Sequence, residues 1–169
     1  MAKGLSAVEY AELYTRAHAD VLRFVARRLI PPDYAKAEDV AHEAFTIAWQ
    51  QLADIPKQPN EAKAWLFAVA RNCLLNSNRA GSRARDLQVR IAESASGVVP
   101  GPSNAVGQRL DLRAAWDRLD AADQEVIALT VWDNLTSVEA AQVLGISAPN
   151  YRMRLNRARS ALRKILESD

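Results

Sequence analysis

The last third of the chain carries the feature that most restricts its fold, which is a pair of helix signals separated by a short glycine-containing turn. Thr136 and Glu139 have the spacing of a capping box, in which each side chain binds a free backbone N–H at a helix start. Gly145 follows an apolar run and suits the left-handed conformation that ends a helix, while Ser147 suits the cap of the next helix. This spacing predicts a helix-turn-helix within residues 136–166.

The second helix of this motif, from Ala148 to about Leu166, has one apolar face and one basic face. Its apolar residues recur at helical spacing and are Tyr151, Leu155, Ala158, Leu162 and Ile165. Arginines and asparagines flank them, and no acidic residue lies between Gly145 and Lys164. Guanidinium groups match guanine and carboxamides match adenine in the major groove. The helix is predicted to bind DNA; the alternative is a solvated basic face on an ordinary surface helix.

Composition sets broad limits on the rest of the chain. Of its 169 residues 49% are hydrophobic, which is enough for a core, and the net charge of +2 makes the position of the basic residues more informative than their number. Cys73 is the single cysteine and His18 and His42 are the only histidines, so neither a disulfide framework nor a metal or cofactor site is predicted. With no apolar run of the ~20 residues that span a bilayer, we expect no membrane insertion and a cytoplasmic protein.

Helical patterns occur along the whole chain, and no alternating strand pattern competes with them. Three helices are expected in the N-terminal part: one that stops at Pro31 and Pro32, one that starts near Asp33, and one capped by Asn60 that runs through Asn78. Two more, 110–119 and 122–132, precede the helix-turn-helix. Residues 82–108 are rich in Gly, Pro and Ser, as flexible connectors are, although 85–92 could continue as a short helix.

The pattern predicts an all-α fold of two small helical domains, residues 1–81 and 109–169, joined by the flexible linker 82–108. The third N-terminal helix is a second candidate DNA surface, because residues 62–85 include five basic residues and no acidic one, with asparagines and aromatics among them. From composition alone, Trp65, Leu66 and Val69 are equally well explained as core residues.

Several segments, in this order and spacing, resemble the extracytoplasmic-function sigma factors of bacterial RNA polymerase, which keep only the second and fourth conserved sigma regions. The matching segments are AEDVAHEAF at 37–45 with Ala48 and Trp49, AWLFAVARN at 64–72, residues 119–127, GIS at 145–147 and RLNRAR at 154–159. The resemblance implies that residues 1–81 bind core polymerase and recognise and open the -10 element. It also implies that residues 109–169 recognise the -35 element and that the linker runs toward the RNA exit path.

The resemblance assigns a role to each matching position. Core polymerase binding is expected at Glu38, Asp39, Glu43 and Trp49, although acids early in a helix also interact favourably with its dipole without touching a partner. Contacts on the -10 side are expected from Lys57, Asn60, Lys63, Trp65, Arg71, Asn72, Asn76 and Arg79, with loop 55–61 receiving a flipped base. As a plain connector, the same loop would need only its prolines and asparagine. Contacts on the -35 side are expected from Thr136, Ser147, Asn150, Tyr151, Arg152, Arg154, Asn156 and Arg157.

Some positions depart from the family pattern. Asn76 stands where the family commonly has Asp, the basic run after it is interrupted at 80–82, and Tyr151 stands where a small branched residue is common. The first two changes leave the -10 sequence preference open, and the third leaves open how the recognition helix sits in its groove.

The implied partners are the clamp helices of the largest polymerase subunit, the flap of the second-largest subunit, promoter DNA and an anti-sigma factor. No Gly-rich phosphate loop or nucleophile and base set is visible, so a non-catalytic subunit is expected. Two other classes are alternatives: a stand-alone helix-turn-helix regulator, which usually carries a dimerising or ligand-binding domain, and a helical adaptor that binds only protein. The linker also permits the two domains to pack together and hide their basic faces.

Overall fold

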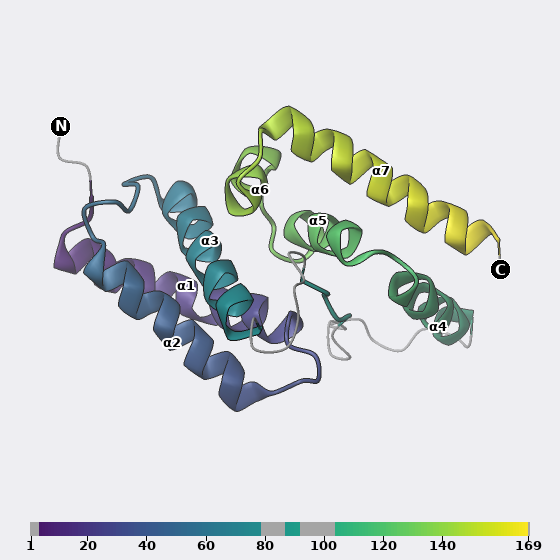
Figure 1. Cartoon of the computed structure of the whole chain (residues 1–169), viewed down its shortest axis with the longest axis horizontal. Coiled ribbons are helices and arrows are strands. Elements are labelled where there is room, and N and C mark those ends of the chain that lie inside the picture. Colours follow the sequence, from purple (N-terminus) through teal and green to yellow (C-terminus); the bar gives the residue numbers. More distant parts are fainter. Residues whose placement is uncertain (1–3, 79–86, 92–103, 169) are drawn as a thin grey trace.

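The computed structural model describes residues 4–78, 87–91 and 104–168, and its regular elements there are all helices. They are α1 (Ala7–Arg27), α2 (Tyr34–Gln50), α3 (Pro59–Asn78), α4 (Asn104–Asp117), α5 (Ala121–Val131), α6 (Ser137–Leu144) and α7 (Ala148–Glu167). Helices α1 to α3 form an N-terminal bundle, and α4 to α7 form a C-terminal bundle beside it (Figure 1). The predicted all-α fold is confirmed. Across the described ranges, no helix is both long enough and apolar enough to cross a membrane.

The N-terminal bundle is a three-helix core whose starts are fixed by local caps. Ser6 and Glu9 form a reciprocal capping box at the start of α1, and the Asp33 side chain accepts a hydrogen bond from the backbone of Lys36 at the start of α2. Inside, the rings of Phe24 from α1 and Phe67 from α3 are stacked with centroids 4.7 Å apart. Each helix contributes one buried face to this core, which leaves the opposite face of α2 at the surface.

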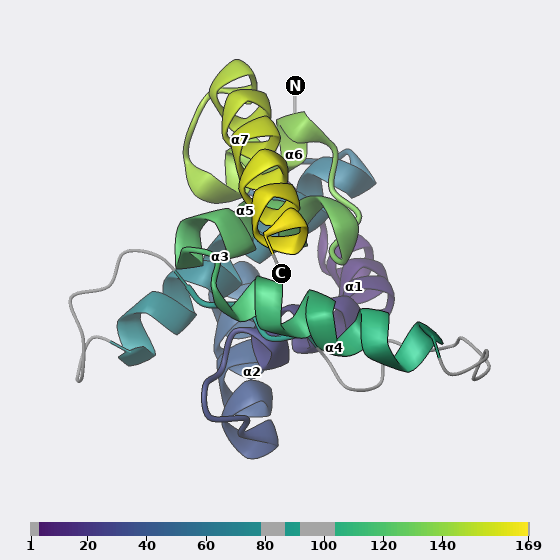
Figure 2. The same cartoon turned by 90° about the vertical axis from the view of Figure 1, so that its right-hand side faces the viewer.

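The C-terminal bundle is organised around α5, which is apolar over much of its circumference. Helices α6 and α7 both pack on it, and α4 packs against α7 (Figure 2). The predicted stripe of α7 faces this core: Tyr151, Leu155 and Ala158 are buried, and Leu162 and Ile165 are partly buried against the same cluster. The opposite face of α7 is therefore left outside.

Three helix boundaries differ from those expected from the sequence. Helix α1 ends at Arg27, before the prolines that were expected to stop it, and α3 begins at Pro59, so Asn60 lies in its first turn instead of capping it. Proline suits the first helical position because its missing N–H has no intrahelical partner there. Helix α4 begins at Asn104, within the expected linker, because a single exposed helical glycine such as Gly107 costs only about 1 kcal/mol.

The described part of the linker is neither a helix nor a free tether. Residues 87–91 have no helical structure, Leu87 and Val89 are buried, and Ile91 is packed against the core. The short helix considered for 85–92 is thus wrong over 87–91. The other residues of that stretch, and 92–103, lie outside the described residues.

The two bundles are packed against each other in a closed arrangement. Helix α3 of the first bundle lies along α6 of the second, and buried residues of both bundles form one continuous apolar cluster. The sequence left this arrangement open. Its consequence is that the two candidate DNA surfaces have different surroundings.

Candidate nucleic-acid interface

Helix α7 presents its basic face to solvent. Arg152, Asn156 and Arg157 are exposed, while Asn150 and Arg154 are half-buried at the edge of the apolar stripe. The candidate residues of the -35 side that lie on this face are therefore within reach of a partner without any change in the chain.

The turn that positions α7 has the geometry expected from the sequence. Thr136 and Glu139 form a capping box at the start of α6, and Gly145 ends α6 with φ at 66°. The Ser147 hydroxyl accepts a hydrogen bond from the backbone N–H of Asn150 at 3.3 Å and starts α7. These predicted caps are confirmed. Thr136 and Ser147 are also exposed, so capping does not exclude a DNA contact from either.

Tyr151 does not belong to the exposed DNA-binding set. Its side chain is fully buried, and its hydroxyl donates to the carbonyl oxygen of Val126 at 2.6 Å and lies 2.7 Å from the hydroxyl of Thr130. Burial raises the pKa of this phenol, so it remains a neutral donor. The expected DNA contact from Tyr151 is corrected to a core role that joins α7 to α5.

One face of α2 carries all four candidate polymerase-binding residues. Glu38, Asp39, Glu43 and Trp49 are exposed, and the Trp49 ring meets the Tyr10 ring edge-on with centroids 5.2 Å apart. The first turn of α2 contains no acidic residue. Since the helix dipole acts mainly over the first turn, it is a weak explanation for these acids.

The candidate residues of the -10 side are divided between exposed and engaged positions. Those exposed are Lys57, Asn60, Asn72 and Asn76; Lys63, Trp65 and Arg71 are half-buried. Trp65 packs against the apolar cluster, which supports the core alternative for part of its ring. Arg79 lies outside the described residues.

Arg71 is held by the C-terminal bundle. Its Nε and Nη2 atoms donate to the two carboxylate oxygens of Glu125 at 2.7 and 2.8 Å. Glu125 belongs to α5 and is buried, and only 12% of the Arg71 side chain is exposed. The residue expected to face -10 DNA is thus facing an internal carboxylate.

Two more arginines join this contact, and we call the five residues Arg27, Arg28, Arg71, Glu125 and Asp133 the interdomain cluster. Arg28 donates to Asp133 at 2.9 Å, lies 3.8 Å from Glu125 and also donates to the carbonyl oxygen of Phe24. Arg27 lies 3.4 Å from Asp133, and burial lowers its pKa. Sequence analysis identified only Arg71 of these five, because the others show no motif.

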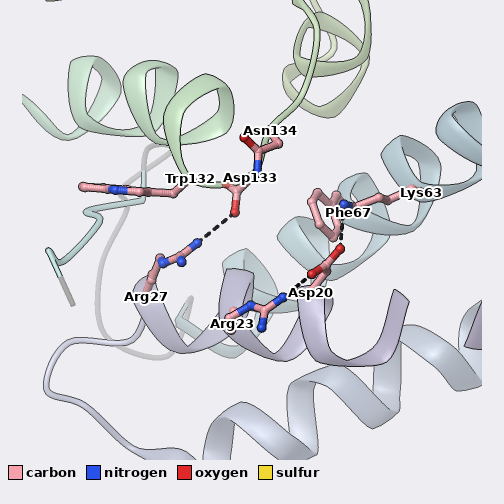
Figure 3. A pocket seen from close by; sticks show the side chains of 8 residues that line it. All are labelled: Asp20, Arg23, Arg27, Lys63, Phe67, Trp132, Asp133 and Asn134. Atoms are coloured by element: carbon pink, nitrogen blue, oxygen red, sulfur yellow. Dashed lines mark hydrogen bonds and ion pairs between the residues drawn. The ribbon is translucent and has the colours of Figure 1, made fainter. Parts of the chain in front are cut away.

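A small cavity of about 70 Å³ lies beside this cluster, between the bundles (Figure 3). Its walls are Asp20, Arg23, Arg27, Lys63, Phe67, Trp132, Asp133 and Asn134. The Asp20 carboxylate bridges Arg23 and Lys63, whose Nζ lies 2.6 Å away. Every cation on the cavity wall therefore has a carboxylate neighbour of this chain.

Residues 87–91 connect the two bundles by hydrogen bonds as well as by packing. The indole N–H of Trp116 donates to the carbonyl oxygen of Val89 at 2.6 Å, and the Val89 N–H donates to Gln124 at 3.0 Å. On the other side, the Arg90 N–H donates to the carbonyl oxygen of Arg27 at 2.8 Å. This segment bonds to both bundles and so stabilises the closed arrangement.

Comparison with protein families identifies both halves of the chain. The model for sigma-70 region 2 matches residues 13–84, and the model for sigma-70 region 4 matches residues 109–162. The RNA polymerase sigma factor CnrH of Cupriavidus metallidurans is 33% identical over 95% of this chain and 87% of its own length. The ECF RNA polymerase sigma factor SigL of Mycobacterium tuberculosis is 35% identical over 89% of this chain and 85% of its own length.

This chain belongs to the extracytoplasmic-function sigma factors of the sigma-70 family. It is a promoter-recognising alternative sigma factor.

Solved structures of two sigma factors share this fold. CnrH in complex with the cytosolic domain of CnrY has 24% identity and a TM-score of 0.58, over 95% of this chain and 88% of that one. RpoE in complex with the anti-sigma factor NepR from Bartonella quintana has 21% identity and a TM-score of 0.56, over 96% of each chain. In the present chain, the region 2 match includes α2 and α3, and the region 4 match includes α7 up to residue 162.

Proposed function

We propose that this sigma factor binds promoters at two points, with α3 and the preceding loop at the -10 element and with α7 at the -35 element. The observation that carries this proposal is the basic, acid-free face of α7, which a capped helix-turn-helix presents to solvent. Its major-groove contacts come from Asn150, Arg152, Arg154, Asn156 and Arg157, with Thr136 and Ser147 placed for phosphates.

On the -10 side, the proposed DNA contacts are the exposed Lys57, Asn60, Asn72 and Asn76, joined by Lys63, Trp65, Arg71 and Arg79. Asparagine amides and the edge of the Trp65 ring suit unpaired bases, and the cations suit phosphates. Because Arg71 is bound to Glu125 in the closed chain, its DNA contact requires the two bundles to separate.

Core polymerase is proposed to dock on α2, through Glu38, Asp39, Glu43 and Trp49. The three acids lie beyond the first turn and Trp49 is half-exposed at 50%, so this face offers an aromatic side chain beside carboxylates. Aromatic residues are enriched in protein interfaces, and rim carboxylates select a basic partner surface. The clamp helices of the largest subunit are the proposed partner, with the flap of the second-largest subunit contacting the C-terminal bundle.

The protein is proposed to be a non-catalytic subunit that acts in the cytoplasm, where the polymerase that it directs works. The domain roles follow the predicted division, with residues 1–81 for polymerase and -10 DNA and residues 109–169 for -35 DNA. An anti-sigma factor is proposed as a further partner, since RpoE was solved in complex with the anti-sigma factor NepR and CnrH in complex with the cytosolic domain of CnrY.

The direct test is in vitro transcription with purified core polymerase and a promoter selected with the reconstituted holoenzyme. The protein is expected to bind core polymerase stably and to produce promoter-dependent initiation. Absence of both activities contradicts the sigma role, and a specific footprint formed without polymerase favours a stand-alone regulator.

Two exposed or half-exposed residues separate the two binding activities in the same assay. Arg154→Ala is expected to weaken binding to the -35 element and leave core binding intact, and Asp39→Ala is expected to do the reverse. Each variant is the control for the other, and equal loss of both activities in each would mean that these residues act in folding.

A further inference from the structure

Three guanidinium groups of the N-terminal bundle converge on two carboxylates of the C-terminal bundle. Arg27 and Arg28 come from the end of α1 and Arg71 from α3, while Glu125 lies on α5 and Asp133 follows it. The pair of Arg71 and Glu125 is bidentate, and a guanidinium binds a phosphate with the same fork geometry. The closed chain therefore places its own acids where a phosphate would fit.

The two carboxylates do not satisfy all the donors that face them. Three cations meet two anions in the interdomain cluster, and the buried Nε of Arg28 has no hydrogen-bond partner. The Arg28 side chain is 0% exposed, so this N–H meets an outside acceptor only when the bundles separate. A buried donor without a partner is destabilising, which favours a further anionic acceptor at this position.

The interdomain cluster is continuous with the proposed -10 surface. Arg71 lies on the same helix as the exposed amides of Asn72 and Asn76, and Arg27 shares a cavity wall with Lys63 of α3. Amides that suit bases next to cations that suit phosphates match nucleic acid better than an acidic protein surface, which has no bases.

Building on the proposed function, we propose that Arg27 and Arg28 extend the -10 DNA surface of α3 as phosphate-binding residues, and that Glu125 and Asp133 occupy them in the closed chain. DNA and the C-terminal bundle then compete for one set of guanidinium groups. In the closed chain, the C-terminal bundle inhibits the binding of DNA to the N-terminal bundle, while α7 remains exposed in both states.

The test measures binding of the full-length protein to a short fluorescent single-stranded DNA of mixed sequence, by anisotropy and without polymerase. The variant Glu125→Gln with Asp133→Asn removes both internal carboxylates. Its Kd is expected to fall about tenfold, as it does when an open fraction of about one tenth rises to near one. Because α7 is exposed in both states, its contribution is common to all variants.

A second pair of substitutions tests the arginines themselves. Arg27→Ala and Arg28→Ala, added to the carboxylate variant, are expected to abolish the gain in affinity. They should also reduce the slope of log K against log salt by about 1.4, since each phosphate contact on a single strand contributes about 0.7.

The matched control is Asp117→Asn with Asp120→Asn, which makes the same change in net charge at exposed positions outside the interdomain cluster. Because salt screens exposed charges, neither the Kd nor the salt slope of this control is expected to change measurably. An equal gain in the control would show a bulk charge effect and overturn the proposal.

Cys73 provides the folding check for every variant. Its thiol is buried in α3, and burial raises its pKa to about 11, so alkylation at neutral pH is slow while the N-terminal bundle stays folded. If the carboxylate variant loses this protection, Asp133→Asn alone is used and a smaller gain in affinity is expected.

Unchanged affinity in the folded carboxylate variant overturns the proposal, and so does a gain that survives the two arginine substitutions. Transcription by the wild-type protein with core polymerase is measured in parallel. If the carboxylate variant shows no gain in DNA affinity while the wild-type protein transcribes normally, this inference alone is contradicted. If the gain is found but the wild-type protein does not support transcription, the proposed sigma role is contradicted.

Discussion

Helices α3 and α7 are both proposed to bind DNA, yet the closed chain leaves one open and engages the other. The basic face of α7 is exposed, and the turn before it is fixed by caps within a few residues. Helix α3 lies along α6, and its Arg71 is bound by Glu125 from the other bundle. The proposed -35 contact is thus available on the C-terminal bundle by itself, whereas the proposed -10 contact depends on how the bundles are arranged.

The largest expected effect is on the free energy of unfolding, which is compared for one substitution in the interdomain cluster and one on the exposed face of α7. Arg28→Ala leaves buried carboxylates short of a partner and is expected to lower the free energy of unfolding by about 3–5 kcal/mol. Arg163→Ala, at an exposed position of α7, is expected to change it by less than about 0.5 kcal/mol. Urea denaturation followed by circular dichroism measures both. Similar losses in the two variants would mean that the cluster does not hold the bundles together.

A smaller loss of stability is expected from Tyr151→Phe. Removing the hydroxyl deletes its hydrogen bonds with the Val126 carbonyl oxygen and the Thr130 hydroxyl, which costs about 1–3 kcal/mol, while the DNA affinity of the folded protein stays unchanged. The control is Tyr34→Phe, because Tyr34 is 65% exposed. A lower DNA affinity for Tyr151→Phe at constant stability would instead support a direct contact between Tyr151 and DNA.

Arg152→Ala is expected to affect DNA binding and not stability. It removes a cation from the exposed face of α7, so the affinity for the selected -35 duplex is expected to fall by about 1–3 kcal/mol, with a weaker sequence preference and a smaller salt slope. Arg16→Ala, on the far bundle, serves as the control. A folded Arg152→Ala variant with wild-type affinity and slope would count against the open α7 surface.

The smallest effect is a pH dependence that involves α3. Burial alone would raise the pKa of Asp20, but Lys63 and Arg23 outweigh it and hold that pKa below its usual value. The stabilisation is therefore complete above the unfolded-state pKa of about 3.9 and is lost as pH falls through the lower folded-state pKa. Unfolding midpoints of wild type and Asp20→Asn should differ at pH 6 and converge toward pH 2, a range set by these pKa values. A constant difference over this range would contradict the ion pair.

The sequence predicted the elements whose determinants are local. Thr136 and Glu139 are three residues apart, Gly145 ends one helix and Ser147 starts the next, so the helix-turn-helix could be located without tertiary information. The apolar stripe of α7 was predicted correctly for the same reason. Tyr151 was assigned both to this stripe and to the DNA surface, and its burial settles that conflict in favour of the stripe.

The interdomain cluster could not be predicted, because its pairs are distant in sequence. Arg28 and Asp133 are 105 residues apart, and Arg71 and Glu125 are 54 apart. Nothing about an isolated Glu125 distinguishes it from a surface acid. Residues 87–91 were likewise interpreted from their polar surroundings, while their order comes from Trp116 and Gln124 of the other bundle.

The most direct test of the closed arrangement is to measure the distance between the two bundles before and after core polymerase binds. Fluorescent dyes at cysteines introduced for the exposed Gln50 of α2 and Ser160 of α7 would report it by energy transfer, and buried Cys73 would remain unlabelled. A closed free chain predicts a predominant high-transfer state in the free protein and a low-transfer state on polymerase, with Glu125→Gln and Asp133→Asn shifting the free protein toward low transfer. The same transfer efficiency in the free, bound and substituted protein would contradict it.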